Sequence, residues 1–334
     1  MTTTRRKLLG SALASAALTG FPAIARGQSA RTLRFSHTDT PQGAANKAAE
    51  LFAERVAQYT QGRYRVQVFH SGQVANDQRS LEQLQVGGLD FALTGTVTFT
   101  THVRPLSLIA LPYLAETYEQ GWKLYDTSSF IKAQIEALPQ LRMRHVGNWE
   151  ASFRSFTTTF PIGSPADMRG KKVRIAPVEM VRWIMEALEA NAVVMPVTEV
   201  YLAIQQGTVL GQENPIDTIY SQRFYEVAKN ITLSQHVYSP RWVAIAERTY
   251  QALSPQDRDA VMRAGKEAGD VNRQEVLRND EALLAEMTAK GATVARPNLA
   301  DWRRAVEPVY ERARREYGAE AVNQLLREAE AIRA

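Results

Sequence analysis

The residue types that could perform chemistry are present in this sequence, but they form no catalytic or metal-binding pattern. The 334-residue chain has no cysteine, which excludes a disulfide framework, a thiolate metal site and a cysteine nucleophile. Its five histidines include no pair at the i,i+3 or i,i+4 spacing that places two imidazoles on one helix face. Nucleophile-elbow, Walker A and dinucleotide-binding glycine motifs are also missing. We therefore expect no catalysis, no metal site and no cofactor.

Polar side chains follow the first predicted strand, at residues 32–36. His37 and Asp39 come directly after it, and α/β sheets hold their ligands in the loops that follow the strands. Glu82 belongs to a helix expected over residues 77–86, whose start is near the same sheet edge. We place all three among the candidate ligand contacts.

Carboxylates are natural acceptors for the hydroxyl groups of a ligand. Asp39, Glu150 and Asp217 are the candidates for this role. If two of them line one cavity, they repel a second ligand carboxylate, which favours a polyhydroxylated monoacid such as a uronate or aldonate over a C4-dicarboxylate. The alternative is that Glu150 and Asp217 pair with arginine or lysine elsewhere.

Periodicity predicts the elements that position these residues. Apolar residues alternate in the strand segments and recur at helical spacing in the others. The order strand–helix–strand–helix–strand is typical of a parallel α/β sheet. This order is predicted first over 32–36, 44–59, 63–69, 77–86 and 90–94, and a second set follows over 152–159, 171–175, 179–189, 191–196, 199–206 and 211–215.

A long helix is predicted near the end of the chain. Ser254 and Pro255 form a helix start, with serine at the N-cap and proline at the first position. The helix can run to Lys290, although Gly265 and Gly269 weaken it. A helix of this length can brace two lobes. A further helical region, with a break at its internal proline, is expected over 302–333.

The N-terminus has the three zones of an export signal. Arg5, Arg6 and Lys7 precede an apolar stretch over residues 8–20, and an Ala-x-Ala site ends at residue 25. Either a twin-arginine or an ordinary secretory signal fits. Without residues 1–25 the formal charge falls from +5 to +2, which gives no electrostatic footprint for nucleic acid. We expect a periplasmic protein.

Several motifs together resemble one family. The 199–216 run, EVYLAIQQGTVLGQENPI, looks like the signature of the periplasmic solute-binding subunits of tripartite ATP-independent periplasmic (TRAP) transporters, of the dicarboxylate-binding-protein type. Other segments agree in order and spacing across nearly the whole chain after the signal: TQGR at 60–63, SGQ at 71–73, DMRGKKVR at 167–174 and FYEV at 224–227.

The resemblance implies a site for an organic acid between two lobes. It assigns Arg174 to a bidentate salt bridge with the ligand carboxylate, and it adds Arg154 and Asn214 as further contacts. The chemistry agrees, because a planar guanidinium presents two parallel donors to two carboxylate oxygens. The alternative for Arg154 is an ion pair between strands. Glu213 is expected to hold its loop.

The sequence thus predicts a two-lobe α/β binding protein with a sheet in each lobe. Lobe I comprises residues 31–150 and about 239–278, and lobe II comprises 151–238 and about 279–334. Hinge closure would capture the solute, and a monomer would deliver it to the membrane subunits of a TRAP transporter.

Two other functions remain open. The same fold serves periplasmic sensor modules. A secreted lyase or hydrolase could use Arg154 and Arg174 as an anion hole with Glu150 or His37 as base, although no nucleophile–base pattern supports it.

Overall fold

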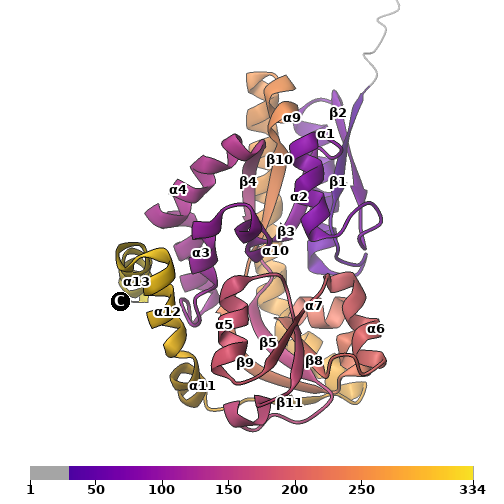
Figure 1. Cartoon of the computed structure of the whole chain (residues 1–334). Coiled ribbons are helices and arrows are strands. Elements are labelled where there is room, and N and C mark those ends of the chain that lie inside the picture. Colours follow the sequence, from indigo (N-terminus) through magenta and orange to yellow (C-terminus); the bar gives the residue numbers. More distant parts are fainter. Residues whose placement is uncertain (1–29, 334) are drawn as a thin grey trace, which may run out of the picture.

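The computed structural model describes residues 30–333, so the predicted signal at 1–25 lies outside the described residues. These residues form two β-sheets with helices packed around them (Figure 1). The strands are β1 (Arg31–Ser36), β2 (Tyr64–Phe69), β3 (Phe91–Gly95), β4 (Met143–Trp149), β5 (Phe153–Thr158), β6 (Lys172–Ile175), β7 (Asn191–Val194), β8 (Gly211–Pro215), β9 (Asn230–Tyr238), β10 (Arg241–Ala246) and β11 (Thr293–Ala295). The α-helices are α1 (Ala44–Tyr59), α2 (Asp77–Val86), α3 (Tyr118–Thr127), α4 (Ser129–Ala137), α5 (Glu179–Ala187), α6 (Val200–Gln205), α7 (Ile216–Ser221), α8 (Phe224–Val227), α9 (Glu247–Ala252), α10 (Pro255–Ala289), α11 (Leu299–Val306), α12 (Pro308–Tyr317) and α13 (Ala319–Arg333).

The first sheet has the order β2-β1-β3-β10-β4 and is mixed, not parallel as predicted. β1 pairs in parallel with both β2 and β3, as the strand–helix–strand order indicates. β10 then inserts between β3 and β4 and runs antiparallel to both. All six residues of β10 are buried, which suits a central strand. Local periodicity carries no information about a partner strand so distant in the chain.

The second sheet has the order β11-β9-β5-β8-β6-β7 and is also mixed. β5 lies antiparallel between β9 and β8, and β6 is parallel to β8. The register pairs Ser155 with Asn214 and Arg174 with Gln212. Arg154, Arg174 and Asn214 therefore lie on three adjacent strands.

Helix α10 crosses both sheets, as the sequence predicts. Its 35 residues contact α1 and β4 on one side and α7 and β11 on the other. Gly265 and Gly269 allow this close approach. An added Cβ would lie 2.4 Å from Val146 Cγ1 at position 265 and 2.7 Å from the Asn148 carbonyl oxygen at position 269. The glycines that weaken the helix locally are thus required by its packing.

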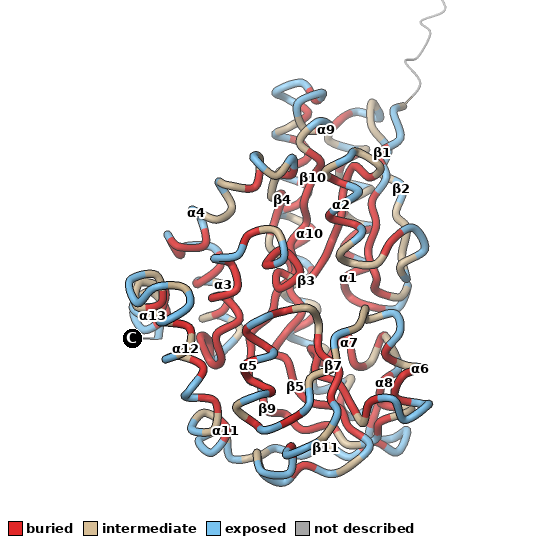
Figure 2. The backbone as a smooth tube through the Cα atoms, in the orientation of Figure 1, coloured by how far each residue is buried: buried red, intermediate tan, exposed pale blue. Residues whose placement is uncertain are grey.

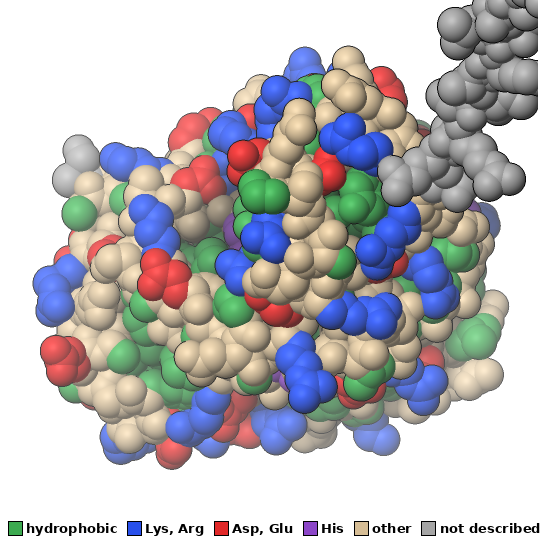
Figure 3. All heavy atoms as spheres, turned by 90° about the horizontal axis from the view of Figure 1, so that it is seen from above, with side chains coloured by type: hydrophobic (Ala, Val, Ile, Leu, Met, Phe, Trp, Pro, Cys, Tyr) green, Lys and Arg blue, Asp and Glu red, His purple; other side chains and the backbone are tan. Residues whose placement is uncertain are grey.

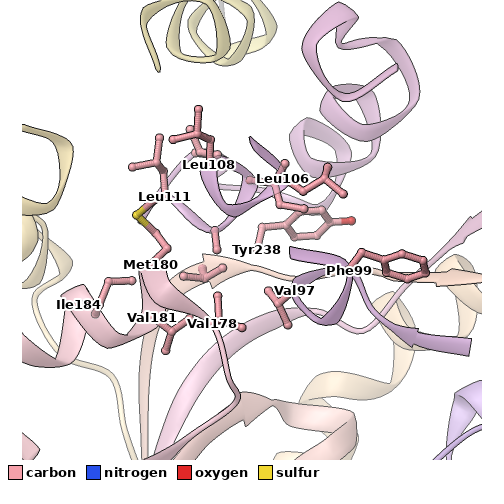
Figure 4. Close-up of a cluster of buried hydrophobic side chains, with 14 of the residues drawn as sticks. Val97, Phe99, Leu106, Leu108, Leu111, Val178, Met180, Val181, Ile184 and Tyr238 are labelled. Atoms are coloured by element: carbon pink, nitrogen blue, oxygen red, sulfur yellow. The ribbon is translucent and has the colours of Figure 1, made fainter. Parts of the chain in front are cut away.

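Apolar contacts join the parts of the molecule around the sheets. Figure 2 shows buried residues following the strands and α10, with exposed residues at the periphery. In Figure 4, Val97, Leu108 and Leu111 meet Met180 and Ile184 of α5 in one cluster. This cluster holds the segment after β3 against the second sheet's helices.

β4 of the first sheet ends at Trp149, and β5 of the second sheet begins at Phe153. The C-terminal helical region breaks at Pro308, as predicted, and again at Gly318, where φ is +89°. α12 contacts α5, whereas α13 contacts α3 and α4, so the assignment of residues 279–334 to one lobe stays a prediction. Helices α3 and α4 are separated at Ser128, whose side chain caps α4.

The described residues contain neither a membrane-spanning helix nor a metal-binding cluster. None of the helices within 30–333 is long and apolar enough to span a bilayer. The same residues contain no group of three or more His, Asp or Glu side chains that could hold a metal ion. In the view of Figure 3, basic and acidic side chains are interspersed over the surface.

Candidate functional site

A cavity lies between the two sheets, with walls from both. Two hydrogen bonds close its margin: Gln222 Nε2 donates to the Thr38 carbonyl oxygen at 2.9 Å, and Ala44 N donates to Asp217 Oδ1 at 3.3 Å. The lobes are therefore in contact around the cavity. Its polar lining comprises Thr38, Asp39, Asp77, Thr94, Thr98 and Arg241 from one side and Arg154, Arg174, Asn214, Thr218 and Gln222 from the other.

Arg174 is a buried cation that forms no direct salt bridge with a carboxylate of the described residues. It lies on β6 with 3% of its surface exposed. Its Nε and Nη2 donate to the Met195 carbonyl oxygen at 3.0 and 2.8 Å, which fixes the plane of the guanidinium. Among residues 30–333 no carboxylate forms a salt bridge with it, and burial lowers its pKa to about 10. A positioned, unneutralised guanidinium is a binding group for an anion.

Arg154 also lines the cavity, but its charge is already paired. Nη2 donates to Glu213 Oε1 at 2.7 Å and to the Glu213 carbonyl oxygen at 2.6 Å, and Nε donates to Oε2. His236 Nε2 lies 3.3 Å from the same Oε2. Although burial alone would raise the pKa of Glu213, the Arg154 charge and the His236 contact lower it to about 2. The ion pair between strands, the alternative for Arg154, is thus present.

Asn214 is held by its neighbours in a defined orientation. Its Oδ1 accepts from Arg154 Nη2 at 3.2 Å, and its Nδ2 donates to Gln212 Oε1 at 2.5 Å. Because β8 is buried along its whole length, the amide faces the cavity from a rigid strand. The structure thus brings Arg154, Arg174 and Asn214 together on one wall.

Asp39 and Asp217 share one salt-bridge partner, Arg241 of β10. Its Nη2 lies 2.8 Å from Asp39 Oδ1 and 3.7 Å from Asp217 Oδ2, and it donates to Thr218 Oγ1 at 3.0 Å. Asp39 lines the cavity, whereas Asp217 lies outside its lining, which corrects the expected position of Asp217. The alternative of pairing with a distant arginine therefore applies to Asp217. No local motif marks Arg241, so the sequence reasoning missed it.

Glu150, His37 and Glu82 lie outside the cavity lining, which corrects their expected positions. Glu150 is fully buried, and its two oxygens already accept from the backbone amides of residues 151 and 152, from Tyr238 Oη at 2.7 Å and from Trp122. His37 packs against Phe35, and burial lowers its pKa to about 4. Glu82 is exposed on α2.

Asp77 is the cavity carboxylate that the sequence reasoning missed. It is the first residue of α2, and Thr38 Oγ1 donates to its Oδ1 at 2.9 Å. It forms no salt bridge within the described chain, and burial raises its pKa to about 6. The available signal was its place at the start of a helix that follows β2 at the ligand-binding edge of the sheet.

This geometry agrees with one protein family. Residues 35–316 match the bacterial extracellular solute-binding proteins of family 7. The chain belongs to this family. Its relatives include the sialic acid-binding periplasmic protein of Vibrio cholerae serotype O1, which is 27% identical over 91% of this chain and 94% of its own.

Two further relatives show the breadth of solutes in the family. The C4-dicarboxylate-binding periplasmic protein of Rhodobacter capsulatus is 28% identical over 95% of this chain and 96% of its own. A TRAP periplasmic solute-binding protein from Sulfitobacter sp. NAS-14.1, with bound β-D-galacturonate, is similar in structure. It has a TM-score of 0.85 and 27% identity over 89% of this chain and 100% of its own. The protein is thus a TRAP-type solute-binding protein with the expected α/β fold.

Proposed function

We propose that the protein captures a hydroxylated organic acid, a uronate or an aldonate, in the periplasm and delivers it to the membrane subunits of a TRAP transporter. Arg174 is the single observation that indicates an acidic solute. A buried guanidinium that forms no salt bridge is energetically costly unless an anion pairs with it. Its Nη1 and the amide of Asn214 contact the solute carboxylate, and Arg154 supports that wall through its pair with Glu213.

The opposite wall supports the preference for a sugar acid. Asp77 accepts from a solute hydroxyl, and the hydroxyl groups of Thr38 and Thr98 can donate or accept. Arg241 balances the charge of Asp39 in a salt bridge. Arg241 therefore has no free charge with which to bind a second carboxylate of the solute. A C4-dicarboxylate would therefore place its second carboxylate beside Asp77. The galacturonate held by the Sulfitobacter relative supports this choice, and the Rhodobacter relative keeps the dicarboxylate as the alternative.

Closure of the two lobes retains the solute. The contacts of Gln222 with Thr38 and of Asp217 with Ala44 join the two lobes, and both are absent once the lobes separate. We propose that a monomer acts, without nucleic acid and without chemical change to the solute. Export relies on residues 1–25.

Binding can be tested with a panel of galacturonate, glucuronate, galactonate and succinate. Thermal shift followed by calorimetry is expected to show binding of a sugar acid, and the solute should be recovered unchanged. Arg174→Met should abolish the shift, whereas Arg169→Met should not, because Arg169 is exposed and paired only with Glu189. Tight binding of succinate alone would contradict the sugar-acid preference. If the protein is folded and none of the four acids produces a thermal shift, the proposal that the protein captures an anion is contradicted.

A further inference from the structure

Three oxygen atoms meet where the chain crosses from one sheet to the other. Ser152 lies between β4 and β5, and its Oγ is 2.7 Å from Tyr118 Oη and 2.7 Å from Asp280 Oδ2. Tyr118 Oη also contacts Asp280 Oδ2, so each oxygen lies within hydrogen-bond distance of the other two. The three residues come from the crossing segment, from α3 and from α10.

A count of protons shows which form of Asp280 this triangle needs. Three oxygen–oxygen contacts require three protons, and the hydroxyl groups of Tyr118 and Ser152 supply two. An ionised carboxylate supplies none, which would leave one contact as two facing lone pairs. A protonated Asp280 supplies the third.

The second carboxyl oxygen supports the same form. Asp280 Oδ1 is shielded from solvent and has no hydrogen-bond partner among the described residues. No salt bridge to Asp280 exists within residues 30–333. A buried charged oxygen without a donor is far more costly than a neutral carbonyl oxygen.

The charged groups around the triangle act in the same direction. Glu150 precedes the crossing segment and Asp217 lies on α7, and both are acidic. Arg241 pairs with Asp39 and Asp217, and Arg273 pairs with Asp126, so neither arginine forms a salt bridge with Asp280. Burial raises the pKa of Asp280 to about 7. The hydrogen bonds from Tyr118 and Ser152 lower this pKa in part, and the two carboxylates raise it further. Burial and Asp280 likewise raise the pKa of Tyr118, so its hydroxyl keeps its proton.

The triangle lies at a strained point of the backbone. Ser152 has φ of +90°, in the region that favours glycine, and such a conformation costs on the order of 1–3 kcal/mol. Its carbonyl oxygen accepts from Ser239 N at 3.3 Å, on the second crossing between the sheets. Asp280 thus contacts the segment whose dihedral angles must change when the lobes move.

We propose that Asp280 is a positioning residue for solute capture. As the lobes close, its carboxyl group takes up one proton from solvent, and the neutral acid holds Ser152 in the conformation of the closed form. This proposal rests on the proposed function, because closure is read through solute binding. The sign of the pH effect follows from linkage. Between the pKa of an exposed aspartate, about 4, and that of the closed form, the closed state binds a proton that the open state has released. Affinity should therefore fall by up to tenfold per pH unit up to about pH 7 and level off above it.

Calorimetry at pH 6 in buffers of different ionisation enthalpy measures this proton uptake, using the panel acid that binds most tightly. We expect the protein to take up close to one proton more per bound solute than Asp280→Asn does, and we expect a flatter affinity profile from pH 5 to 8 in the variant. Asp77 titrates in both proteins and cancels from this difference. Asp270→Asn is the matched control, because Asp270 is an exposed acid on the same helix.

Equal uptake in Asp280→Asn, or none in the unaltered protein, would overturn the proposal. If Asp280→Asn does not fold, Tyr118→Phe serves in its place. It leaves one oxygen contact and one hydroxyl proton, so an ionised Asp280 is accommodated and uptake should fall. If no panel acid binds, the proposed function fails separately. Proton release in the open form then remains testable by the infrared carbonyl band of Asp280, which is the band missing in Asp280→Asn. In the solute-free protein this band should be lost as the pH rises through about 4, and a band still present at pH 6 would overturn the proposal.

Discussion

Replacing Arg174 with methionine should weaken solute binding without weakening the fold. Burial lowers the pKa of this guanidinium from 12.5 to about 10, which at 1.36 kcal/mol per pH unit means that its charge costs the solute-free protein about 3 kcal/mol. Methionine removes that cost and keeps most of the apolar packing. It also loses two hydrogen bonds to the Met195 carbonyl oxygen, worth about 1 kcal/mol each. The solute-free variant should therefore be as stable as the unaltered protein, or about 1 kcal/mol more stable.

Binding should change in the opposite direction. Removing one partner of a buried, hydrogen-bonded charge pair costs about 2–5 kcal/mol, which raises Kd roughly 30- to 5,000-fold. Urea unfolding of the solute-free protein and calorimetric titration with galacturonate measure the two effects independently.

Arg154→Met provides the contrast with the same substitution. Its partner Glu213 is fully buried, so the variant leaves a carboxylate without its arginine and should lose about 3–5 kcal/mol of stability even without solute. The reasoning is refuted if Arg174→Met loses more than about 2 kcal/mol of stability, or if it binds the acid within threefold of the unaltered protein.

Three further predictions concern the wall opposite Arg174, the buried ion pair and the long helix. Asp77→Asn should raise Kd for a sugar acid about tenfold while improving the affinity for succinate, and calorimetry with both acids checks this; parallel changes for the two would contradict it. Glu213 has a pKa of about 2 against 4.5 in the unfolded chain, so its contribution to stability is present above pH 4.5 and is lost as the pH falls toward 2. Urea unfolding between pH 5 and 2.5 should show a smaller loss for Glu213→Gln, and an unchanged slope would count against the assignment. Gly269→Ala should lower the free energy of unfolding by about 1–3 kcal/mol, because its methyl group would meet the Asn148 carbonyl oxygen at 2.7 Å, and urea unfolding would show a gain if helix propensity dominated instead.

Local patterns predicted most of the elements because their causes lie within the elements themselves. The helix over 44–59 and the helix over 77–86 have the predicted bounds, since each combines helical apolar spacing with a glycine near its end. The long helix from Pro255 was predicted from its serine N-cap. Strands β9 and β10 were not predicted. The pairing of β10 leaves no local signature, because its partners lie some 100 to 150 residues earlier in the chain.

The candidate site also has a part that the sequence predicted and a part that it did not. Arg154, Arg174 and Asn214 were predicted from motifs, and the sheet register places them on adjacent strands. Whether each charge is free or paired depends on residues that no spacing links. Arg154 and Arg174 both follow the motif, yet only Arg154 has a carboxylate, because Glu213 faces it across β8. Arg241 forms salt bridges with both Asp39 and Asp217 from a strand with no motif.

The sequence by itself determined the family, most of the helices and strands as far as β8, and the two arginines that line the cavity. The tertiary structure decided which of these charges remain available for a solute and which are already neutralised. It also decided that Glu150 and His37 are buried outside the cavity and that Asp77 lines it. The physical reason is that electrostatic free energy depends on burial and on the distances between charges, and both are set by contacts between residues that are far apart in the chain.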